Sequence, residues 1–97
     1  MDAKKHRKSH HSEIVKHDLV SRLNRIEGQI RGIRNLIVND AYCDDIIHQI
    51  ASVQAAIGGL NGILVENHLK TCVTDRLRSG DPDIVKEFVK TIKKISK

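Results

Sequence analysis

Two cysteines and one histidine have the residue types and the spacing of a metal site. They are Cys43, His68 and Cys72. His68 and Cys72 are four residues apart, and residues at i and i+4 lie on one face of a helix. Two thiolates are soft ligands that select Cu(I), and one imidazole completes a three-coordinate site, whereas zinc usually takes a fourth ligand. The trio therefore predicts a Cu(I) site.

Each of the three residues also has an ordinary structural interpretation. A buried free cysteine behaves as a small hydrophobe, and a single histidine on an apolar helix face is commonly a core residue with satisfied hydrogen bonds. The spacing of His68 and Cys72, in line with Cys43, favours metal binding over three unrelated core positions.

An apolar seam fills the interval between Cys43 and His68. Its steps of four and three residues are typical of a helix packed along a partner helix. A continuous helix would hold Cys43 and His68 about 37 Å apart, since each residue adds about 1.5 Å. The trio would then meet only in an antiparallel pair of chains, which would form two equivalent sites per dimer. The seam residues are Ile46, Ile50, Val53, Ile57, Leu60 and Leu64.

Three glycines leave a second arrangement open. Gly58, Gly59 and Gly62 fall inside the seam, and each glycine costs about 1 kcal/mol in a helix interior. A break there would turn the helix into a hairpin, and one chain would complete the site by itself.

Length and composition favour a small helical protein with polyanionic partners. Ninety-seven residues make one domain at most, and so short a chain is commonly stabilised by oligomerisation. Aromatic residues are only 2%, which argues against stacking-based binders of single-stranded nucleic acid. The net charge of +5 favours a partner such as DNA, although an ordinary solvated surface is the alternative.

The sequence contains no membrane-spanning run and no visible signal peptide. With only two cysteines, it indicates free thiols in a reducing, cytoplasmic compartment. It also contains no paired carboxylates, nucleophile triad or phosphate loop, so we do not expect an enzyme.

Two further helices and a tail flank the seam. Residues 1–11 are polar and basic, and we expect them to form a disordered tail. We expect residues 12–97 to form one helical domain. A first helix should begin near Ser12 and end at Asn39-Asp40, with Asp40 capping the next helix so that Cys43 is its third residue. The second helix should run to about Ser79, with Gly80 as its terminator. Asp81-Pro82 should then open a third helix.

Basic residues gather on the first and third helices. Arginine dominates the first, and its planar fork of donors suits phosphate contact, although charges on a helix are commonly just solvated. We expect DNA contacts from Lys16, Arg22, Arg25, Gln29 and Arg31, with support from Lys90 and Lys94.

Three stretches of the chain resemble the CsoR/RcnR family of bacterial metal-sensing repressors. The likeness covers residues 12–97, and its first stretch is fairly specific to the family. The Cys-His-Cys trio resembles the ligand set of the copper-sensing branch of this family. The stretches are Arg22-Leu23-Asn24-Arg25-Ile26-Glu27-Gly28-Gln29, Tyr42-Cys43-Asp44-Asp45 and His68-Leu69-Lys70-Thr71-Cys72.

This resemblance implies an all-α, three-helix protomer with a continuous second helix, an antiparallel four-helix dimer, and a homotetramer made of two dimers. It implies a repressor that binds double-stranded operator DNA when metal-free and dissociates on binding Cu(I), which switches on copper export or buffering. It also implies that Tyr42 and Glu87 form an outer shell around the metal. Tyr42 matches the family position directly, and Glu87 matches it if one residue is deleted near Pro82.

Two alternatives remain open. Nickel-sensing members of the same family use an extra histidine near the N-terminus, and His11 lies near that position. The chain would then be a four-coordinate Ni(II) or Co(II) sensor. A copper-buffering protein would share the thiols, but it would not need a basic surface.

Overall fold

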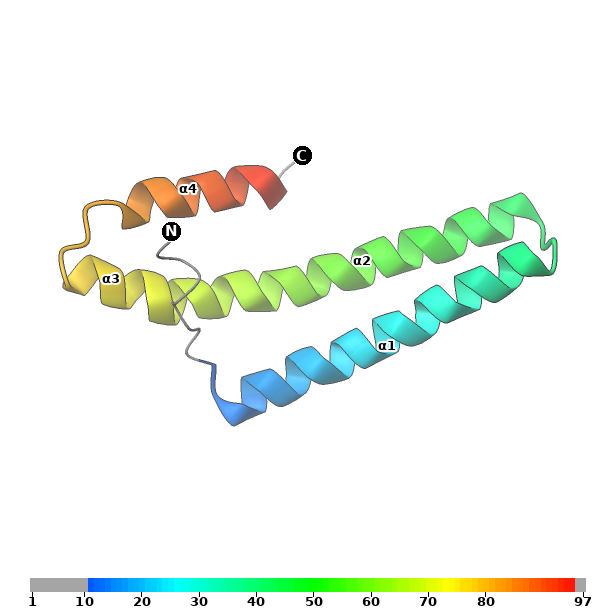
Figure 1. The fold of residues 1–97 in the computed structure, drawn as a ribbon, viewed down its shortest axis with the longest axis horizontal. Coiled ribbons are helices and arrows are strands. Elements are labelled where there is room, and N and C mark those ends of the chain that lie inside the picture. Colours follow the sequence, from blue (N-terminus) through cyan, green and yellow to red (C-terminus); the bar gives the residue numbers. More distant parts are fainter. Residues whose placement is uncertain (1–10, 96–97) are drawn as a thin grey trace, which may run out of the picture. The chain divides into compact units, whose positions relative to one another are not determined.

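The computed structural model describes residues 11–95, and every regular element in that part of the chain is a helix (Figure 1). The all-α class predicted from the sequence is therefore confirmed. His11–Leu64 form one compact unit, and the residues from Val65 onwards belong to a second. The elements are α1 (Glu13–Val38), α2 (Cys43–His68), the π-helical turn η2 (Leu69–Val73), α3 (Thr74–Arg78) and α4 (Ile84–Ile95).

α1 begins and ends where its capping residues predict. The Ser12 hydroxyl accepts a hydrogen bond from the Val15 amide at 3.2 Å, which satisfies one of the free amides of the first turn. At the other end Asp40 adopts φ 55, the left-handed conformation that closes a helix. The Asp40 amide donates to the Ile37 carbonyl, and the Ala41 amide donates to the Leu36 carbonyl.

The predicted start of α2 is wrong by two residues, because Asp40 closes α1 instead of capping α2. An N-cap residue needs an extended backbone, and Asp40 is left-handed. The Tyr42 carbonyl accepts the first bonds of α2, from the Asp45 and Ile46 amides at 3.0 and 3.3 Å. Cys43 is therefore the first residue of α2, and not its third.

α2 runs without a break through Gly58, Gly59 and Gly62. None of the three has a positive φ. A Cβ added at Gly59 would meet Arg22 Nη1 of α1 at 3.8 Å, which is ordinary van der Waals contact. The hairpin alternative is therefore wrong, and the continuous helix is confirmed.

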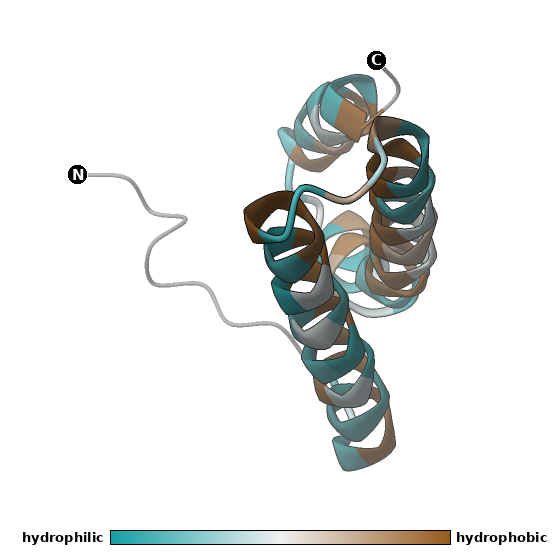
Figure 2. Ribbon diagram, turned by 90° about the vertical axis from the view of Figure 1, so that its right-hand side faces the viewer, coloured by the Kyte–Doolittle hydropathy of each residue, from teal (hydrophilic) through white to brown (hydrophobic). Residues whose placement is uncertain are grey.

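Half of the apolar stripe on α1 and α2 is covered within the protomer and half is not. Figure 2 shows apolar residues recurring along both helices. Ile26 and Val53 are only 6% and 7% exposed. The covered set repeats every seven residues: Leu19, Ile26 and Ile33 on α1, and Ile46, Val53 and Leu60 on α2. The uncovered set repeats with the same period: Leu23, Ile30 and Ile37, and Ile50, Ile57 and Leu64.

The second unit turns sharply at Gly80, as predicted. Gly80 has φ 77, which glycine adopts without strain. The Gly80 amide donates to the Leu77 carbonyl at 3.1 Å, and the Asp81 amide donates to the Arg76 carbonyl at 3.0 Å. This pair of bonds closes α3 as a Schellman motif.

α4 begins later than predicted. Its first residue is Ile84 rather than Pro82, because the Asp83 carbonyl accepts the first helical bond, from the Glu87 amide at 3.0 Å. The Asp81 carboxylate accepts from the Asp83 amide at 2.9 Å and stabilises the turn that leads into the helix. Ile84 is fully buried and Val73 is 3% exposed, and these two residues form the core of the unit.

Among the described helices, none is long and apolar enough to cross a membrane. The tail predicted over residues 1–11 lies outside the described residues except for His11.

Candidate metal centre

The first predicted ligand lies at the exposed start of α2. Cys43 is an exposed free thiol, and the neighbouring Tyr42 side chain is 74% exposed. Cys43 precedes Ile50 by seven residues and continues the uncovered set of Ile50, Ile57 and Leu64. The thiol therefore belongs to the face of α2 that the protomer leaves uncovered.

The other two predicted ligands lie around the π-helical turn in the second unit. His68 is the last residue of α2, and Cys72 falls inside η2. The Thr71 hydroxyl donates to the Asn67 carbonyl at 2.8 Å and lies 3.6 Å from Cys72 Sγ. The Thr74 hydroxyl donates to the Leu69 carbonyl at 2.7 Å. These side-chain bonds hold the widened turn, a feature that is frequent at functional sites.

His68 packs against α4. Its ring and that of Phe88 are 6.1 Å apart between centroids and are inclined by 31°. Both side chains are half-buried. Nothing in the spacing of Phe88 in the sequence indicates that it neighbours a predicted metal ligand.

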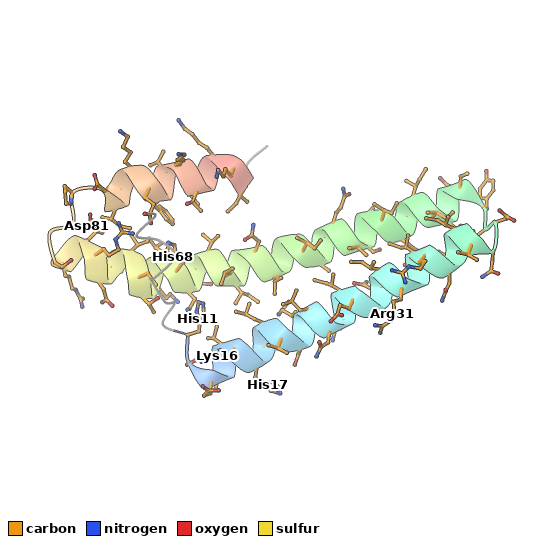
Figure 3. All side chains as sticks on the ribbon, viewed as in Figure 1. His11, Lys16, His17, Arg31, His68 and Asp81 are labelled. Atoms are coloured by element: carbon orange, nitrogen blue, oxygen red, sulfur yellow. The ribbon has the colours of Figure 1, made fainter. Side chains whose placement is uncertain are left out.

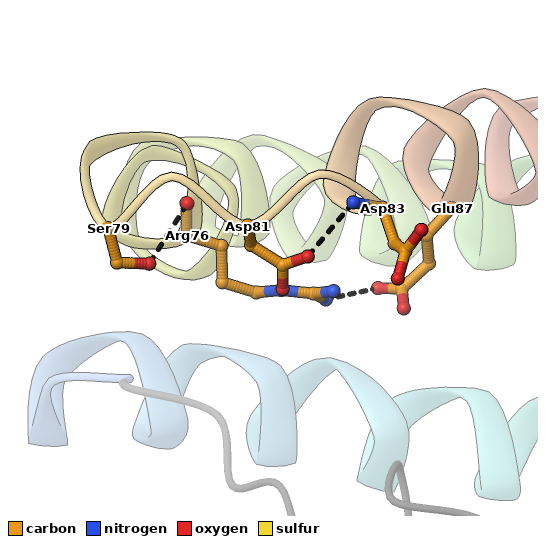
Figure 4. A network of polar contacts seen from close by, with 5 residues as sticks. All are labelled: Arg76, Ser79, Asp81, Asp83 and Glu87. Carbon is orange, nitrogen blue, oxygen red and sulfur yellow. Dashed lines mark hydrogen bonds and ion pairs between the residues drawn. The ribbon is translucent and has the colours of Figure 1, made fainter.

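An ion-pair network closes the turn between α3 and α4 (Figure 4). Arg76 donates from Nε to Asp81 Oδ2 at 2.7 Å and from Nη1 to Glu87 Oε2 at 2.6 Å. The hydrogen bond that Arg76 donates to Asp81 raises the pKa of the Arg76 guanidinium; desolvation opposes this rise, and Glu87 adds to it. Glu87, which was predicted to belong to the outer shell of the metal, is thus bonded by an arginine that sequence reasoning missed.

The described chain does not assemble the trio by itself. Within residues 11–95, no group of three or more His, Cys, Asp and Glu side chains is placed to hold a metal ion. Cys43 belongs to the first unit, while His68 and Cys72 belong to the second. Cys43 and His68 also stand at opposite ends of α2.

The residues predicted to contact DNA differ in their surroundings. On α1, Arg22 pairs with Asp18 at 3.1 Å and Lys16 pairs with Glu13 at 3.5 Å. Figure 3 shows the side chains of Lys16 and Arg31 on this helix. Gln29 is half-buried, and its Oε1 is buried without a hydrogen-bond partner. That oxygen is therefore not presented at the surface of the protomer. The remaining residues predicted to contact DNA are exposed: Arg25, Arg31, Lys90 and Lys94.

The model of a known family, described as metal-sensitive transcriptional repressor, matches residues 15–94. The chain belongs to this family. It is 43% identical over 90 residues to the copper-sensing transcriptional repressor CsoR of Bacillus subtilis, covering 92% of this chain and 89% of the relative. It is 40% identical over 67 residues to the copper-sensing transcriptional repressor RicR of Mycobacterium tuberculosis, covering 69% of this chain and 70% of the relative.

A solved member of similar structure is the copper-sensing repressor CsoR with Cu(I) from Geobacillus thermodenitrificans. The two chains superpose with a TM-score of 0.85 at 32% identity, over 93% of this chain and 95% of that one. The family assignment made from the sequence is confirmed, and so is the expectation that the chain is not an enzyme. The roles of individual residues within the metal-sensitive repressor fold stay predictions.

Proposed function

We propose that this chain is a Cu(I)-responsive transcriptional repressor. It binds operator DNA when metal-free and dissociates on binding Cu(I), which relieves the repression of genes for copper export and homeostasis. The observation that carries the proposal is the donor set of two free thiols and one imidazole on a metal-sensitive repressor fold. Such a soft set fits Cu(I) better than Zn(II) or Ni(II). The chain acts in the cytoplasm, where the DNA lies and thiols stay reduced.

Cys43 of one protomer and His68 and Cys72 of another would hold the ion. One continuous helix separates Cys43 from His68, so a single chain supplies only part of each site. The uncovered set extends from Cys43 through Ile50, Ile57 and Leu64, and an antiparallel partner helix would cover it. Two chains would then form a four-helix dimer with two sites, and two dimers would form a tetramer.

When bound, Cu(I) supplies a soft centre that links ligands from two chains. His68 has a second ring nitrogen that can donate to a neighbouring acceptor and fix the orientation of the ring. Glu87 in α4 and Tyr42 of the partner subunit are the residues we assign to this outer shell. Allostery requires such contacts to differ between the metal-free and the metal-bound protein.

The DNA surface lies along α1 with support from α4. Arg22, Arg25 and Arg31 carry guanidinium groups that suit phosphate oxygens, and Lys90 and Lys94 add point charges on α4. The net charge of +5 favours the approach to a polyanion.

A metal titration of DNA binding tests the proposal. DNA fragments would first be selected from a random pool by the metal-free protein, and the affinity for the best fragment would then be measured at one fixed salt concentration. Cu(I) should weaken the complex at about one ion per protomer, and Ni(II) and Zn(II) should not. If only Ni(II) released the DNA, and if His11→Ala abolished that release, the chain would be a nickel sensor and not a copper sensor. A protein that binds Cu(I) but selects no DNA would be a copper buffer.

A further inference from the structure

Arg76 ties the helical turn that follows Cys72 to the first turn of α4. Its guanidinium bonds Glu87 of α4 at 2.6 Å and Asp81 of the intervening turn at 2.7 Å (Figure 4). The three side chains are only 17–22% exposed. Hydrogen bonds between ionised groups are roughly twice as strong as neutral ones, and solvent screens these two less than it screens an exposed pair. The contact is therefore directional, and not a diffuse attraction at the surface.

The position of Arg76 links it to the metal ligands. His68, Cys72 and Arg76 follow one another at intervals of four residues along a continuous helical path through η2 and into α3. Val73, which follows Cys72, is 3% exposed, and the η2 turn packs against α4. A displacement of the turn that carries Cys72 must therefore displace the base of Arg76 as well.

We infer that Arg76 is a positioning residue that couples the Cys72 turn to α4 through Glu87. Arg76 touches no metal ligand in the described contacts, and it acts by holding a carboxylate on another helix. Because α4 also carries Lys90 and Lys94, the same tether connects the metal centre to part of the DNA surface. This inference rests on the proposed function, since it names the path by which the ligand turn reaches DNA.

A purely structural clamp would behave differently. Its removal would lower the stability of the fold but leave the response to copper unchanged. The informative quantity is therefore the ratio of DNA affinities without and with Cu(I), measured together with the Cu(I) affinity. Arg78 provides a matched control, because it carries the same charge on the same short helix but is exposed.

We would compare Arg76→Gln, Arg78→Gln and the parent protein at one salt concentration. Arg76→Gln should keep its Cu(I) affinity within about threefold of the parent, and its metal-free DNA affinity within about threefold of Arg78→Gln. Its affinity ratio should nevertheless fall at least about fivefold, while Arg78→Gln keeps the parental ratio. Without metal, amide hydrogen exchange over residues 84–95 should be faster in Arg76→Gln than in the parent protein, and Arg78→Gln should exchange like the parent. Parental exchange there would overturn the tether.

A double-mutant cycle tests whether Arg76 acts through Glu87. Adding Arg76→Gln to a Glu87→Gln protein should change the ratio of DNA affinities without and with Cu(I) by less than about twofold. The separate variant Arg76→Lys should keep part of the ratio that Arg76→Gln loses. If Arg76→Gln does not fold, Glu87→Gln carries the test, and a parental ratio in that protein overturns the inference.

The proposed function and this inference fail in different ways. A parent that keeps its DNA when Cu(I) is added overturns the proposed function and the inference with it. A responsive parent with an equally responsive Arg76→Gln protein, or with independent effects in the cycle, overturns the inference alone.

Discussion

Cys43 is the first residue of α2 and His68 is its last, so one unbroken helix separates two of the three predicted copper ligands. At a rise of about 1.5 Å per residue this separation is about 37 Å, far beyond any metal–ligand bond. The glycines that might have folded the helix back lie in regular helix. If the trio binds one ion, a second chain must provide Cys43.

The first prediction concerns the coordination of copper. X-ray absorption of the Cu(I)-loaded protein should give about two sulfur ligands and one nitrogen ligand, because two thiolates and one imidazole favour a three-coordinate soft ion. Cys72→Ala should remove one sulfur, and the exposed His48→Ala should leave the spectrum unchanged. A spectrum with four ligands that drops one nitrogen on His11→Ala would contradict the three-coordinate site.

The second prediction concerns the DNA surface on α1. Arg22→Ala/Arg25→Ala should weaken DNA binding by at least about tenfold. The slope of log K against log salt concentration should also become less steep, by about 0.9 for each phosphate that the protein no longer neutralises. The control Lys70→Ala/Arg78→Ala removes two positive charges from exposed positions outside α1. Equal salt slopes for the two double variants would reject α1 as the main DNA-binding surface.

The third prediction concerns the uncovered apolar set. Ile57 is 46% exposed in the protomer, and we place it against a partner chain. Ile57→Asp would bury a carboxylate there, which costs on the order of several kcal/mol. Sedimentation should therefore show smaller particles, together with a lower unfolding temperature.

Ile47 offers the matched control, since it is 60% exposed on the same helix but lies outside the uncovered set. Ile47→Asp should sediment like the parent protein. Dissociation caused equally by both substitutions, or by neither, would argue against this seam as the dimer interface.

Sequence reasoning predicted most helix ends correctly because those depend on local chemistry. Ser12 and Gly80 act through their own hydrogen bonds or backbone conformation, and the trio is visible as breaks in an apolar period. The π-helical turn was missed because its bonds, such as Thr74 to Leu69, compete with regular helix only in the folded chain. The pairing of Arg76 with Glu87 spans eleven residues across a turn, which no helical period encodes.

Two helix starts were also predicted wrongly. Asp40 suits both a helix start and a left-handed helix end, and the structure uses it for the second. α4 begins at Ile84, because its first helical bond runs from the Glu87 amide to the Asp83 carbonyl, while the Asp81 carboxylate bonds the Asp83 amide and Arg76 in the turn before the helix. In both cases the residue types fitted two local arrangements, and the sequence pattern did not distinguish between them.

The fourth prediction separates copper affinity from copper response. His68→Ala should keep substantial Cu(I) affinity, because two thiolates alone can hold the ion in a linear site, and it should still bind DNA. Its ratio of DNA affinities without and with Cu(I) should fall at least about fivefold, since allostery depends on contacts that differ between states. His48→Ala should keep the parental ratio. A parental ratio in His68→Ala would mean that the thiolates alone operate the switch.

The fifth prediction concerns sharing of the site between chains. A Cys43→Ala chain and a His68→Ala/Cys72→Ala chain, carrying different tags, would be co-expressed and the hybrid dimer isolated through both tags. In an antiparallel dimer, the intact Cys43 of one chain meets the intact His68 and Cys72 of the other, while the second site has no ligands left.

Cu(I) titration of this hybrid against a strong competing chelator tests the shared site most directly. A site built from two chains predicts one high-affinity Cu(I) per hybrid dimer, two per parent dimer, and none in dimers of either variant alone. A hybrid that binds no more tightly than the separate variants, although dimeric by sedimentation, would contradict it.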